Sequence, residues 1–383
     1  MTRSLLFLVI LYLLITGCSR NNQGIPSFQD KSMKIVKPVR YAKGFTIQSN
    51  GKNVLIKVVN PWQNANNVEY SYLLSDTLQK SSILNENHCL IKTPVSRVVC
   101  LSTTHIGFIS SLNETVSIVG VSGKNFVANE NLQAKIRQDQ LPDVGYDENL
   151  NFELILKLRP DVVFAYGVSG SITNTVRKLN EMGIPTILIA EYLEEEPMAK
   201  MEWVKVFGAL YGRSSDADEK FDSADSKYQH LRLLASGTNN KPAVLLGLPW
   251  RGNWFISGGK SYVARLVEDA GGEYIFKHLD FKDSQPVALE QVYERALGAD
   301  FWLNTGDALC KKDLFSVDER FRNLPCIKRD QIFNNNNRIT PAGGNDIFES
   351  GVAEPEIILS DLIYILHPQL LPSHQLKYYR KLQ

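Results

Sequence analysis

The hydrophobic pattern near the N-terminus is that of β structure. From residue 45 the stretch FTIQSNGKNVLIKVV alternates apolar and polar positions on either side of Asn50-Gly51. Such alternation around Asn-Gly predicts a β-hairpin with a tight turn. The following stretch VEYSYLL predicts a third strand. We expect this small β segment to end before Pro94.

A different pattern begins at Arg97, where short apolar runs alternate with segments of helical spacing. The predicted strands are RVVCLS, SIVGVS, DVVFAYG and TILIA, and the predicted helices are HIGFISSLN, FELILKL and VRKLNEMG. A second series begins at Lys241, with strands AVLLGL, FWLNTG and QIFNNN and helices YVARLVEDAG, LEQVYERALG and PEIILSDLIYIL. Residues 197–235 between the two series predict helix without strands. This alternation predicts an α/β fold of two lobes, each with a parallel sheet covered by helices and joined by helix.

The first residues predict export from the cytoplasm. Arg3 precedes an apolar stretch over residues 5–15, which is too short to span a bilayer comfortably and is typical of a signal peptide. The segment ends in Gly17-Cys18 and therefore resembles a bacterial lipoprotein signal, which implies cleavage before Cys18 and lipidation of its thiol. The alternative is an ordinary secretory signal. We expect a periplasmic protein that is lipid-anchored to a membrane through Cys18, with the choice of inner or outer membrane open.

Composition narrows the range of partners. The chain has 383 residues, 44% of them hydrophobic, and 42 Lys and Arg against 41 Asp and Glu. Such a neutral chain without a basic block is not expected to bind nucleic acid. Cys310 and Cys326 could form a disulfide in an oxidising compartment, whereas Cys100 lies in an apolar run and is expected in the core. The chain has no C-x-x-C, so a zinc–thiolate site has no support.

Longer stretches of both series are similar to one family. They are RVVCLSTTHIGFISSLNETVSIVGVSG, DVGYDENLNFELILKLRPDVVFAYG, WFISGGKSYVARLVEDAGGEYIF, PVALEQVYERALGADFWLNTG and EPEIILSDLIYILHP. Over residues 94–372 the chain resembles the periplasmic solute-binding proteins of ABC importers, in the class that takes up iron–siderophore complexes, haem and cobalamin. The resemblance implies two Rossmann-like lobes bridged by one long helix, with the ligand in the cleft between them. It also implies a small hinge motion.

The resemblance and the hydrophobic pattern together divide the chain. The expected parts are a lipoprotein signal peptide (1–17), a linker (18–34), a small β extension (35–93), an N-terminal α/β lobe (94–213), an interlobe helix (214–238) and a C-terminal α/β lobe (239–383). The extension is not part of the family's general pattern, and the sequence assigns it no role.

Candidate ligand contacts follow the predicted strands, because open parallel α/β sheets bind ligands outside the carboxyl ends of their strands. Aromatic faces at this edge suit a flat conjugated or catecholate ligand. The predicted contacts are Tyr146, Tyr166, Tyr192, Trp250, Arg251, Trp254 and His105. Arg251 is expected to pair with an anionic oxygen of the ligand. Each aromatic residue could instead be a partly buried packing residue.

His105 has two interpretations. It could be an axial metal ligand, or it could simply follow a helix N-terminus that residues 102–104 cap. The other histidines are scattered, which predicts no metal site made by the protein itself.

Two other interpretations, a nucleotide-binding P-loop and a hydrolase, are excluded because their motifs require a residue spacing that the chain lacks. The stretch WRGNWFISGGKS ends like a P-loop, but G-x-x-x-x-G-K-[ST] requires glycine at position 254, which is tryptophan. A hydrolase would need G-x-S-x-G, and no stretch of the chain has it at the required spacing. We therefore predict a binding protein rather than an enzyme, with no catalytic residues and no covalently bound cofactor.

The resemblance also implies a docking surface. In cobalamin-binding members, one glutamate on each lobe docks onto arginines of the permease, and the matching positions are Glu153 and Glu290. Each glutamate begins a predicted helix, where a carboxylate is also favoured by the helix dipole. The expected partners are an ABC importer permease dimer with its ATPase and a small-molecule metal complex, an iron chelate, haem or cobalamin. The main hypothesis is delivery of an iron complex, siderophore or haem. The alternatives are a corrinoid ligand or, more distantly, a surface scaffold lipoprotein.

Overall fold

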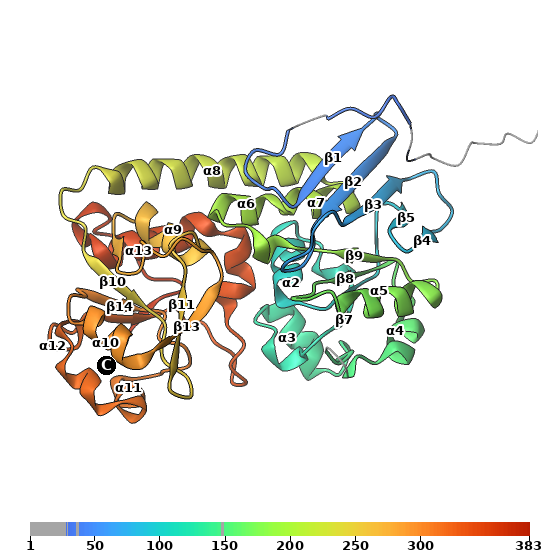
Figure 1. Cartoon of the computed structure of the whole chain (residues 1–383). Helices are drawn as coiled ribbons and strands as arrows, with labels where there is room; N and C mark the ends of the chain where they lie inside the picture. The colour runs from blue at the N-terminus through green and yellow to red at the C-terminus, as the bar shows by residue number, and fades with distance from the viewer. Residues whose placement is uncertain (1–27, 29, 36–37, 147–148) are drawn as a thin grey trace, which may run out of the picture.

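Two α/β lobes lie side by side, with a β extension above the N-terminal lobe and a long helix across both lobes (Figure 1). The computed structural model describes residues 28, 30–35, 38–146 and 149–383. The predicted α/β class, with a β extension, is confirmed. Cys18 and the predicted signal peptide lie outside the described residues.

The extension is a mixed five-stranded sheet in the order β1-β2-β3-β5-β4. Its strands are β1 (Phe45–Ser49), β2 (Asn53–Val59), β3 (Glu69–Ser75), β4 (Ser82–Asn85) and β5 (His88–Lys92). The predicted hairpin joins β1 and β2, and its turn forms because Gly51 has a φ of 86° while the Asn50 side chain accepts from the N–H groups of Lys52 and Asn53. The sequence did not predict β4 and β5.

The N-terminal lobe is built on a four-stranded parallel sheet in the order β7-β6-β8-β9. Its strands are β6 (Val98–Cys100), β7 (Ile118–Val121), β8 (Val162–Ala165) and β9 (Thr186–Leu188). Its helices are α2 (Thr103–Ser111), α3 (Glu130–Arg137), α4 (Phe152–Leu158) and α5 (Ile172–Glu181). The strands are almost wholly buried, as expected for a parallel sheet covered on both faces.

Residues 197–236 form three helices, in a region that the sequence predicted as helix without strands. They are α6 (Pro197–Glu202), α7 (Val204–Leu210) and α8 (Ser214–Ser236). Helix α7 is buried along its whole length, whereas α8 buries only one stripe of side chains. Helix α8 contacts α7 on one side and α13 (Pro355–Leu366) of the C-terminal lobe on the other, so it spans both lobes (Figure 1).

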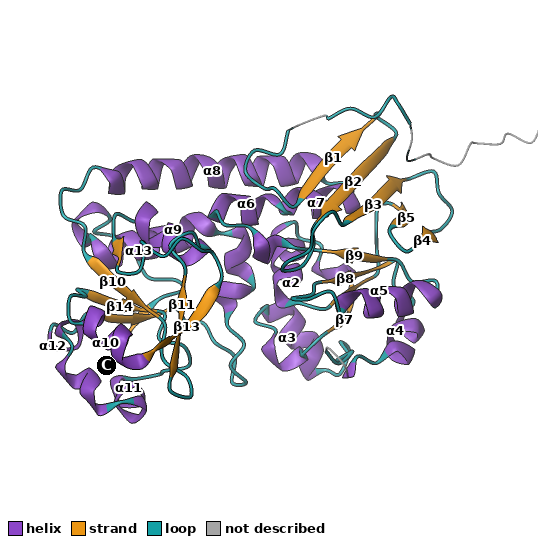
Figure 2. Cartoon of the chain, viewed as in Figure 1, coloured by secondary structure: helices purple, strands orange, loops and turns teal. Residues whose placement is uncertain are grey.

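The C-terminal lobe has a five-stranded sheet in the order β12-β10-β14-β15-β16, parallel except for β16. Its strands are β10 (Ala243–Leu246), β12 (Glu273–Tyr274), β14 (Phe301–Leu303), β15 (Ile332–Asn334) and β16 (Arg380–Lys381). Its other helices are α9 (Tyr262–Asp269), α10 (Leu289–Ala296), α11 (Lys311–Val317) and α12 (Pro325–Lys328). Figure 2 shows these helices around the strands.

A separate antiparallel pair, β11 (Asn253–Ser257) with β13 (Ser284–Ala288), was not predicted. It begins at the WRGN turn, where Trp250 and Asn253 exchange backbone hydrogen bonds. The strand then alternates, with Trp254 and Ile256 buried and Phe255 exposed.

Residues 38–44, which we call the strap, fasten the extension to the N-terminal lobe. The Glu202 carboxylate accepts from the backbone N–H groups of Arg40, Tyr41 and Ala42 at 2.8, 2.8 and 3.0 Å. It also accepts from Lys205 Nζ at 2.6 Å, and its side chain is fully buried. A second buried carboxylate, Glu194, accepts from the N–H groups of Lys43 and Gly44. The strap therefore adds backbone donors to two buried carboxylates, whose other partners are the nearby side chains of Lys205 and Trp203.

The strap also reaches the helix between the lobes. Tyr41 Oη donates to the carboxylate of Asp225 on α8 at 2.9 Å, and the Arg40 guanidinium lies 3.1 Å from the same carboxylate. The extension is therefore bound to the N-terminal lobe and to α8 alike.

The described cysteines are free thiols, so Cys310 and Cys326 do not pair in this structure. Cys100 is buried in β6, as its apolar surroundings predicted.

Candidate functional site: the interlobe cleft

Two adjoining cavities lie at the carboxyl ends of the C-terminal lobe's strands, where it faces the N-terminal lobe. The larger, which we call the outer cleft, has a volume of about 870 Å³, and the smaller, the inner chamber, about 110 Å³. Both are lined by Leu246, Val263, Asn304, Asn335 and Phe348. Leu246 ends β10, and Asn304 and Asn335 directly follow β14 and β15. This is the strand edge at which open α/β sheets bind ligands.

Aromatic side chains contribute the apolar surface of the outer cleft. Phe126 comes from the N-terminal lobe, after β7, while Phe255 lies on β11 and Phe348 in the segment after β15. All three are exposed, with 46%, 46% and 58% of their surface accessible. Asparagine amides supply polar groups beside them. Apolar walls with a few polar groups are the usual composition of small-molecule sites.

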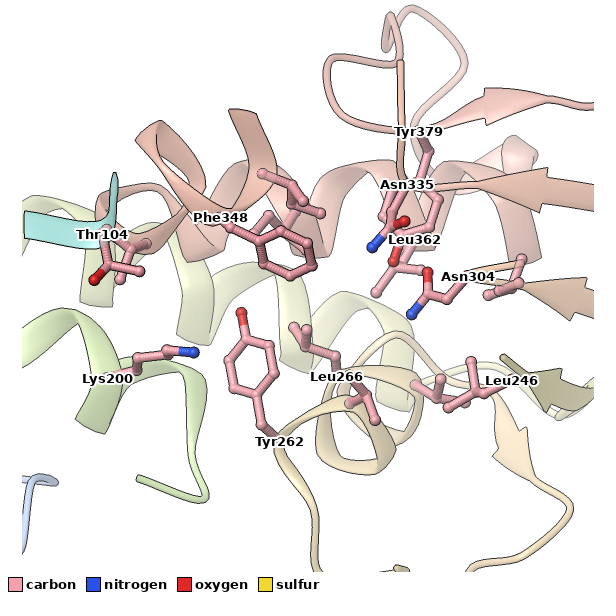
Figure 3. Close-up of a pocket in the computed structure, with 16 residues that line it drawn as sticks. Thr104, Lys200, Leu246, Tyr262, Leu266, Asn304, Asn335, Phe348, Leu362 and Tyr379 are labelled. Carbon is pink, nitrogen blue, oxygen red and sulfur yellow. The ribbon is translucent and has the colours of Figure 1, made fainter. Parts of the chain in front are cut away.

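The inner chamber receives polar side chains from both lobes (Figure 3). Lys200 lies on α6, and Thr104 lies in the first turn of α2 close by on the N-terminal side. Tyr262 is the first residue of α9 in the C-terminal lobe, and the Ser261 hydroxyl fixes that helix start by accepting from the Ala264 N–H. Lys200 Nζ lies 4.8 Å from the centroid of the Tyr262 ring. Both lobes therefore contribute to one small space.

A buried carboxylate lies next to the chamber. Glu191 is 2% exposed, and its Oε2 atom has no hydrogen-bond partner among the described residues. Burial raises the pKa of Glu191, while the charge of Lys200 and a hydrogen bond from Thr104 oppose that shift. Burial likewise lowers the pKa of Lys200, and Glu191 opposes that shift. The two charges therefore stabilise each other in a poorly solvated place.

A second connection between the lobes, which we call the clasp, joins residues 125–129 to residues 340–349. Glu349 accepts from the N–H groups of Ala128 and Asn129, each at 2.7 Å. Thr340 Oγ1 donates to the carbonyl of Asn125 at 2.9 Å. The backbones also approach closely, because a Cβ at Gly107 would lie 1.8 Å from the carbonyl oxygen of Glu349.

The clasp should make stability depend on pH. Burial raises the pKa of Glu349 to about 7, although the two N–H donors oppose the shift. Because its pKa is higher in the folded than in the unfolded protein, Glu349 favours folding fully below about pH 4.5, and this contribution disappears as pH rises through 7. In Glu349→Gln, which cannot titrate, we expect the loss of unfolding free energy between pH 5 and pH 8 to be smaller by about 2 kcal/mol. Urea unfolding at several pH values measures it, and equal pH profiles in both proteins would contradict the prediction.

A family model described as "Periplasmic binding protein" matches residues 98–337 of this chain. This chain belongs to the periplasmic binding protein family. The match confirms the resemblance stated above, and with it the prediction of a binding protein rather than an enzyme.

Relatives and solved structures agree with that assignment. This periplasmic binding protein is 25% identical to the uncharacterized lipoprotein MJ0878 of Methanocaldococcus jannaschii, over 91% of this chain and 86% of that one. It is 26% identical to the high-affinity haem uptake system protein IsdE of Staphylococcus aureus, over only 38% of this chain and 48% of that one. It has the fold of the periplasmic haem-binding protein RhuT of Roseiflexus sp. RS-1 in apo form. There the TM-score is 0.54 at 20% identity, covering 72% of this chain and 99% of RhuT.

Two of the predicted ligand contacts, Trp254 and His105, are buried within the binding protein and line neither cavity. Trp254 is fully buried, its Nε1 donates to the Leu246 carbonyl at 3.0 Å, and it packs on Trp302. On the same strand it is Phe255 that lies in the outer cleft. His105 is also fully buried, and neither ring nitrogen has a partner among the described residues.

The surroundings of His105 favour the structural interpretation. Burial lowers the pKa of His105 to about 3, and its ring lies 6.4 Å from that of Tyr166. The Ser102 hydroxyl accepts from the Thr104 N–H, so these residues cap α2 as the alternative interpretation expected. The prediction that His105 contacts ligand is therefore not supported by its position.

The other predicted contacts lie outside the two cavities. Tyr146, Tyr166, Trp250 and Arg251 are exposed, and the Arg251 guanidinium lies 4.3 Å from the Trp250 ring centroid. Tyr192 is partly buried, and its hydroxyl donates to the Gly167 carbonyl at 2.7 Å. Their contact with ligand stays a prediction.

None of the residues that line the two cavities is among the predicted ligand contacts named above. Phe126 and Asn335 follow β7 and β15, so the strand-end rule would have found them had it been applied to those two strands. Lys200 and Tyr262 lie on helices, and no sequence pattern indicates that they face the same chamber.

The predicted docking glutamates lie on separate lobes. Glu153 is exposed in the first turn of α4, and Glu290 is exposed in the first turn of α10. Glu290 Oε1 lies 3.4 Å from the Arg320 guanidinium, so this carboxylate has a partner within its own lobe.

No group of three or more His, Cys, Asp and Glu side chains among the described residues could hold a metal ion. None of the helices in these ranges is both long enough and apolar enough to cross a membrane.

Proposed function

We propose that this periplasmic binding protein captures an iron complex, a siderophore or haem, in the interlobe cleft and delivers it to an ABC importer permease. The observation that carries the proposal is the outer cleft, whose 870 Å³ is walled by the exposed rings of Phe126, Phe255 and Phe348. A volume within roughly 300–1,000 Å³ suits a ligand of several rings, and aromatic walls suit a flat or conjugated one. IsdE is described as a haem uptake system protein and RhuT as a haem-binding protein, and these similarities support an iron complex as the ligand.

Tryptophan-fluorescence titration tests the ligand. The purified mature protein is titrated with haem, with a panel of ferric siderophores and with cyanocobalamin, with inner-filter controls. We expect saturable quenching by haem or a siderophore, and weaker binding in Phe255→Ala and Phe348→Ala. Leu233→Ala, an exposed position on α8, is the matched control. Saturable binding of cyanocobalamin alone would replace the iron complex by a corrinoid, and no binding by any would contradict the proposal.

We further propose that Glu153 and Glu290 dock onto the permease. Both carboxylates begin helices and are exposed on different lobes, so the two lobes offer one charge each. The charge reversals Glu153→Arg and Glu290→Arg together should lower uptake of the ligand through the permease about tenfold or more. The introduced arginines would then face the arginines expected on the permease, and like charges repel. Ligand affinity should not change. The matched control reverses two exposed glutamates elsewhere, Glu86→Arg and Glu219→Arg. Wild-type uptake in the docking variant would reject the assignment.

The membrane anchor remains a proposal as well. Cys18 lies outside the described residues, and its lipidation is supported by the Gly17-Cys18 sequence and by lipoprotein relatives such as MJ0878.

A further inference from the structure

The inner chamber differs from the outer cleft in size and in charge. Its 110 Å³ lies well below the roughly 300–1,000 Å³ of cavities that enclose a whole drug-sized ligand. It is nevertheless large enough for several water molecules. Most of its lining is apolar, and among the described residues that line it Lys200 alone carries a charge. The chamber therefore suits a short arm of a ligand whose body lies in the outer cleft.

Two hydrogen-bond donors from opposite lobes meet in this chamber. Figure 3 shows the amino group of Lys200 and the side chain of Tyr262 facing each other, with the ring of Phe348 opposite. Within the described parts of the chain, neither the Lys200 amino group nor the Tyr262 hydroxyl makes a side-chain hydrogen bond. Lys200 is partly buried, and an ammonium group with reduced access to water and no acceptor is costly, so this arrangement favours an added acceptor.

The groups around Lys200 and Tyr262 indicate which charge an acceptor bound between them should carry. Glu191 is the carboxylate that offsets the charge of Lys200, but among the described residues the two form no ion pair within 4.0 Å, and Glu191 lies outside the chamber's lining. Asn304 and Asn335 offer amide groups on the far side. A carboxylate placed between Lys200 and Tyr262 would accept a charge-assisted bond from one and a hydroxyl bond from the other. A second cation in the same space would be repelled by Lys200.

We propose that the inner chamber binds a carboxylate arm of the ligand, with Lys200 Nζ and Tyr262 Oη as its donors. This inference rests on the proposed function, because the body of the ligand occupies the outer cleft. Lys200 belongs to α6 and Tyr262 to α9, so the arm contacts both lobes. The subsite therefore selects ligands that carry a carboxylate, and it ties the two lobes together when such a ligand binds.

Two pairs of probes test the subsite, each pair differing only in the anionic group. The first is haem and its dimethyl ester, compared by fluorescence titration. The second is propionate and its neutral isostere propionamide, compared at 100 mM and constant ionic strength by thermal unfolding of the full mature chain. The variants are Lys200→Met and Tyr262→Phe, which keep the apolar volume. Lys312→Met, at an exposed position on α11, is the matched control.

We expect the wild-type protein and Lys312→Met to bind haem at least about tenfold more tightly than the diester, a preference typical of a charge-assisted bond. Propionate, but not propionamide, should raise their unfolding midpoint by about 2 °C. Lys200→Met should abolish both differences and Tyr262→Phe should reduce them.

The possible outcomes test the carboxylate subsite and the proposed function independently of each other. If haem does not bind but propionate still acts through Lys200, haem is rejected as ligand and the subsite stands. If haem and its diester bind equally and propionate has no Lys200-dependent effect, the subsite is overturned and the proposed function stands. If neither probe shows an effect that depends on Lys200, the subsite is likewise overturned.

Discussion

Trp254→Ala should lower the free energy of unfolding by about 3–5 kcal/mol, the range typical of a large aromatic side chain removed from a core. Trp254 is fully buried, and its ring lies 5.6 Å from that of Trp302 and 5.8 Å from that of Phe321. Its Nε1 also donates to the Leu246 carbonyl, which would lose that donor. Urea unfolding followed by circular dichroism measures the change.

Trp250→Ala is the matched control, because Trp250 lies only four residues earlier but is 59% exposed. It should change the unfolding free energy by no more than about 0.5 kcal/mol. Equal stability losses in the two variants would show that Trp254 is not the core residue described here. A large loss of ligand affinity in a stable Trp254→Ala protein would restore the sequence-based expectation.

Glu202→Ala should also lower the free energy of unfolding by about 3–5 kcal/mol, since it leaves Lys205 buried without its partner. The side chains of Lys205 and Glu202 are 10% and 0% exposed, and their charged atoms lie 2.6 Å apart. Three backbone N–H groups of the strap lose their acceptor at the same time. We expect the extension to become sensitive to protease before the rest of the protein.

An exposed ion pair provides the comparison. Lys57 and Glu69 lie 2.9 Å apart on the extension, with 35% and 46% of their side chains exposed. Glu69→Ala should cost no more than about 1 kcal/mol, as exposed pairs usually do. A Glu202→Ala protein as stable and as protease-resistant as Glu69→Ala would contradict the anchoring role of the strap.

The sequence predicted the elements whose hydrophobic pattern is local. The hairpin around Asn50-Gly51 and the alternation of apolar strands with helices from Arg97 onward each depend on neighbouring residues only. The missed strands lack such a pattern: β4 is only four residues long, and β13, SQPVA, contains a proline and is mostly exposed. Their pairing partners, rather than their own residues, determine that they are strands.

The sequence predicted the sheet edge at which the candidate site lies, but it did not predict the side chains that line the cavities. The strand-end rule pointed to the edge at which both cavities lie, and whether ligand binds there stays a prediction. The rule selected Trp254 instead of Phe255 because the strand β11 was not predicted, and in a strand adjacent residues face opposite sides. The clasp could not be found from sequence at all, since Glu349 and Ala128 are 221 positions apart. Only the folded chain brings Lys200 and Tyr262 into one chamber.

The strap has a consequence for how this protein unfolds. The family match begins at residue 98, but Glu202 and Glu194 within it are satisfied by residues 40–44, and the Leu188 N–H in β9 donates to the hydroxyl of Tyr72. A chain cut at residue 98 would lose the strap's N–H donors to both carboxylates and the acceptor of the Leu188 N–H, leaving Glu202 with Lys205 and Glu194 with Trp203. The extension and the N-terminal lobe should therefore melt in a single cooperative transition, so the smallest independently folding unit is larger than the region that defines the family.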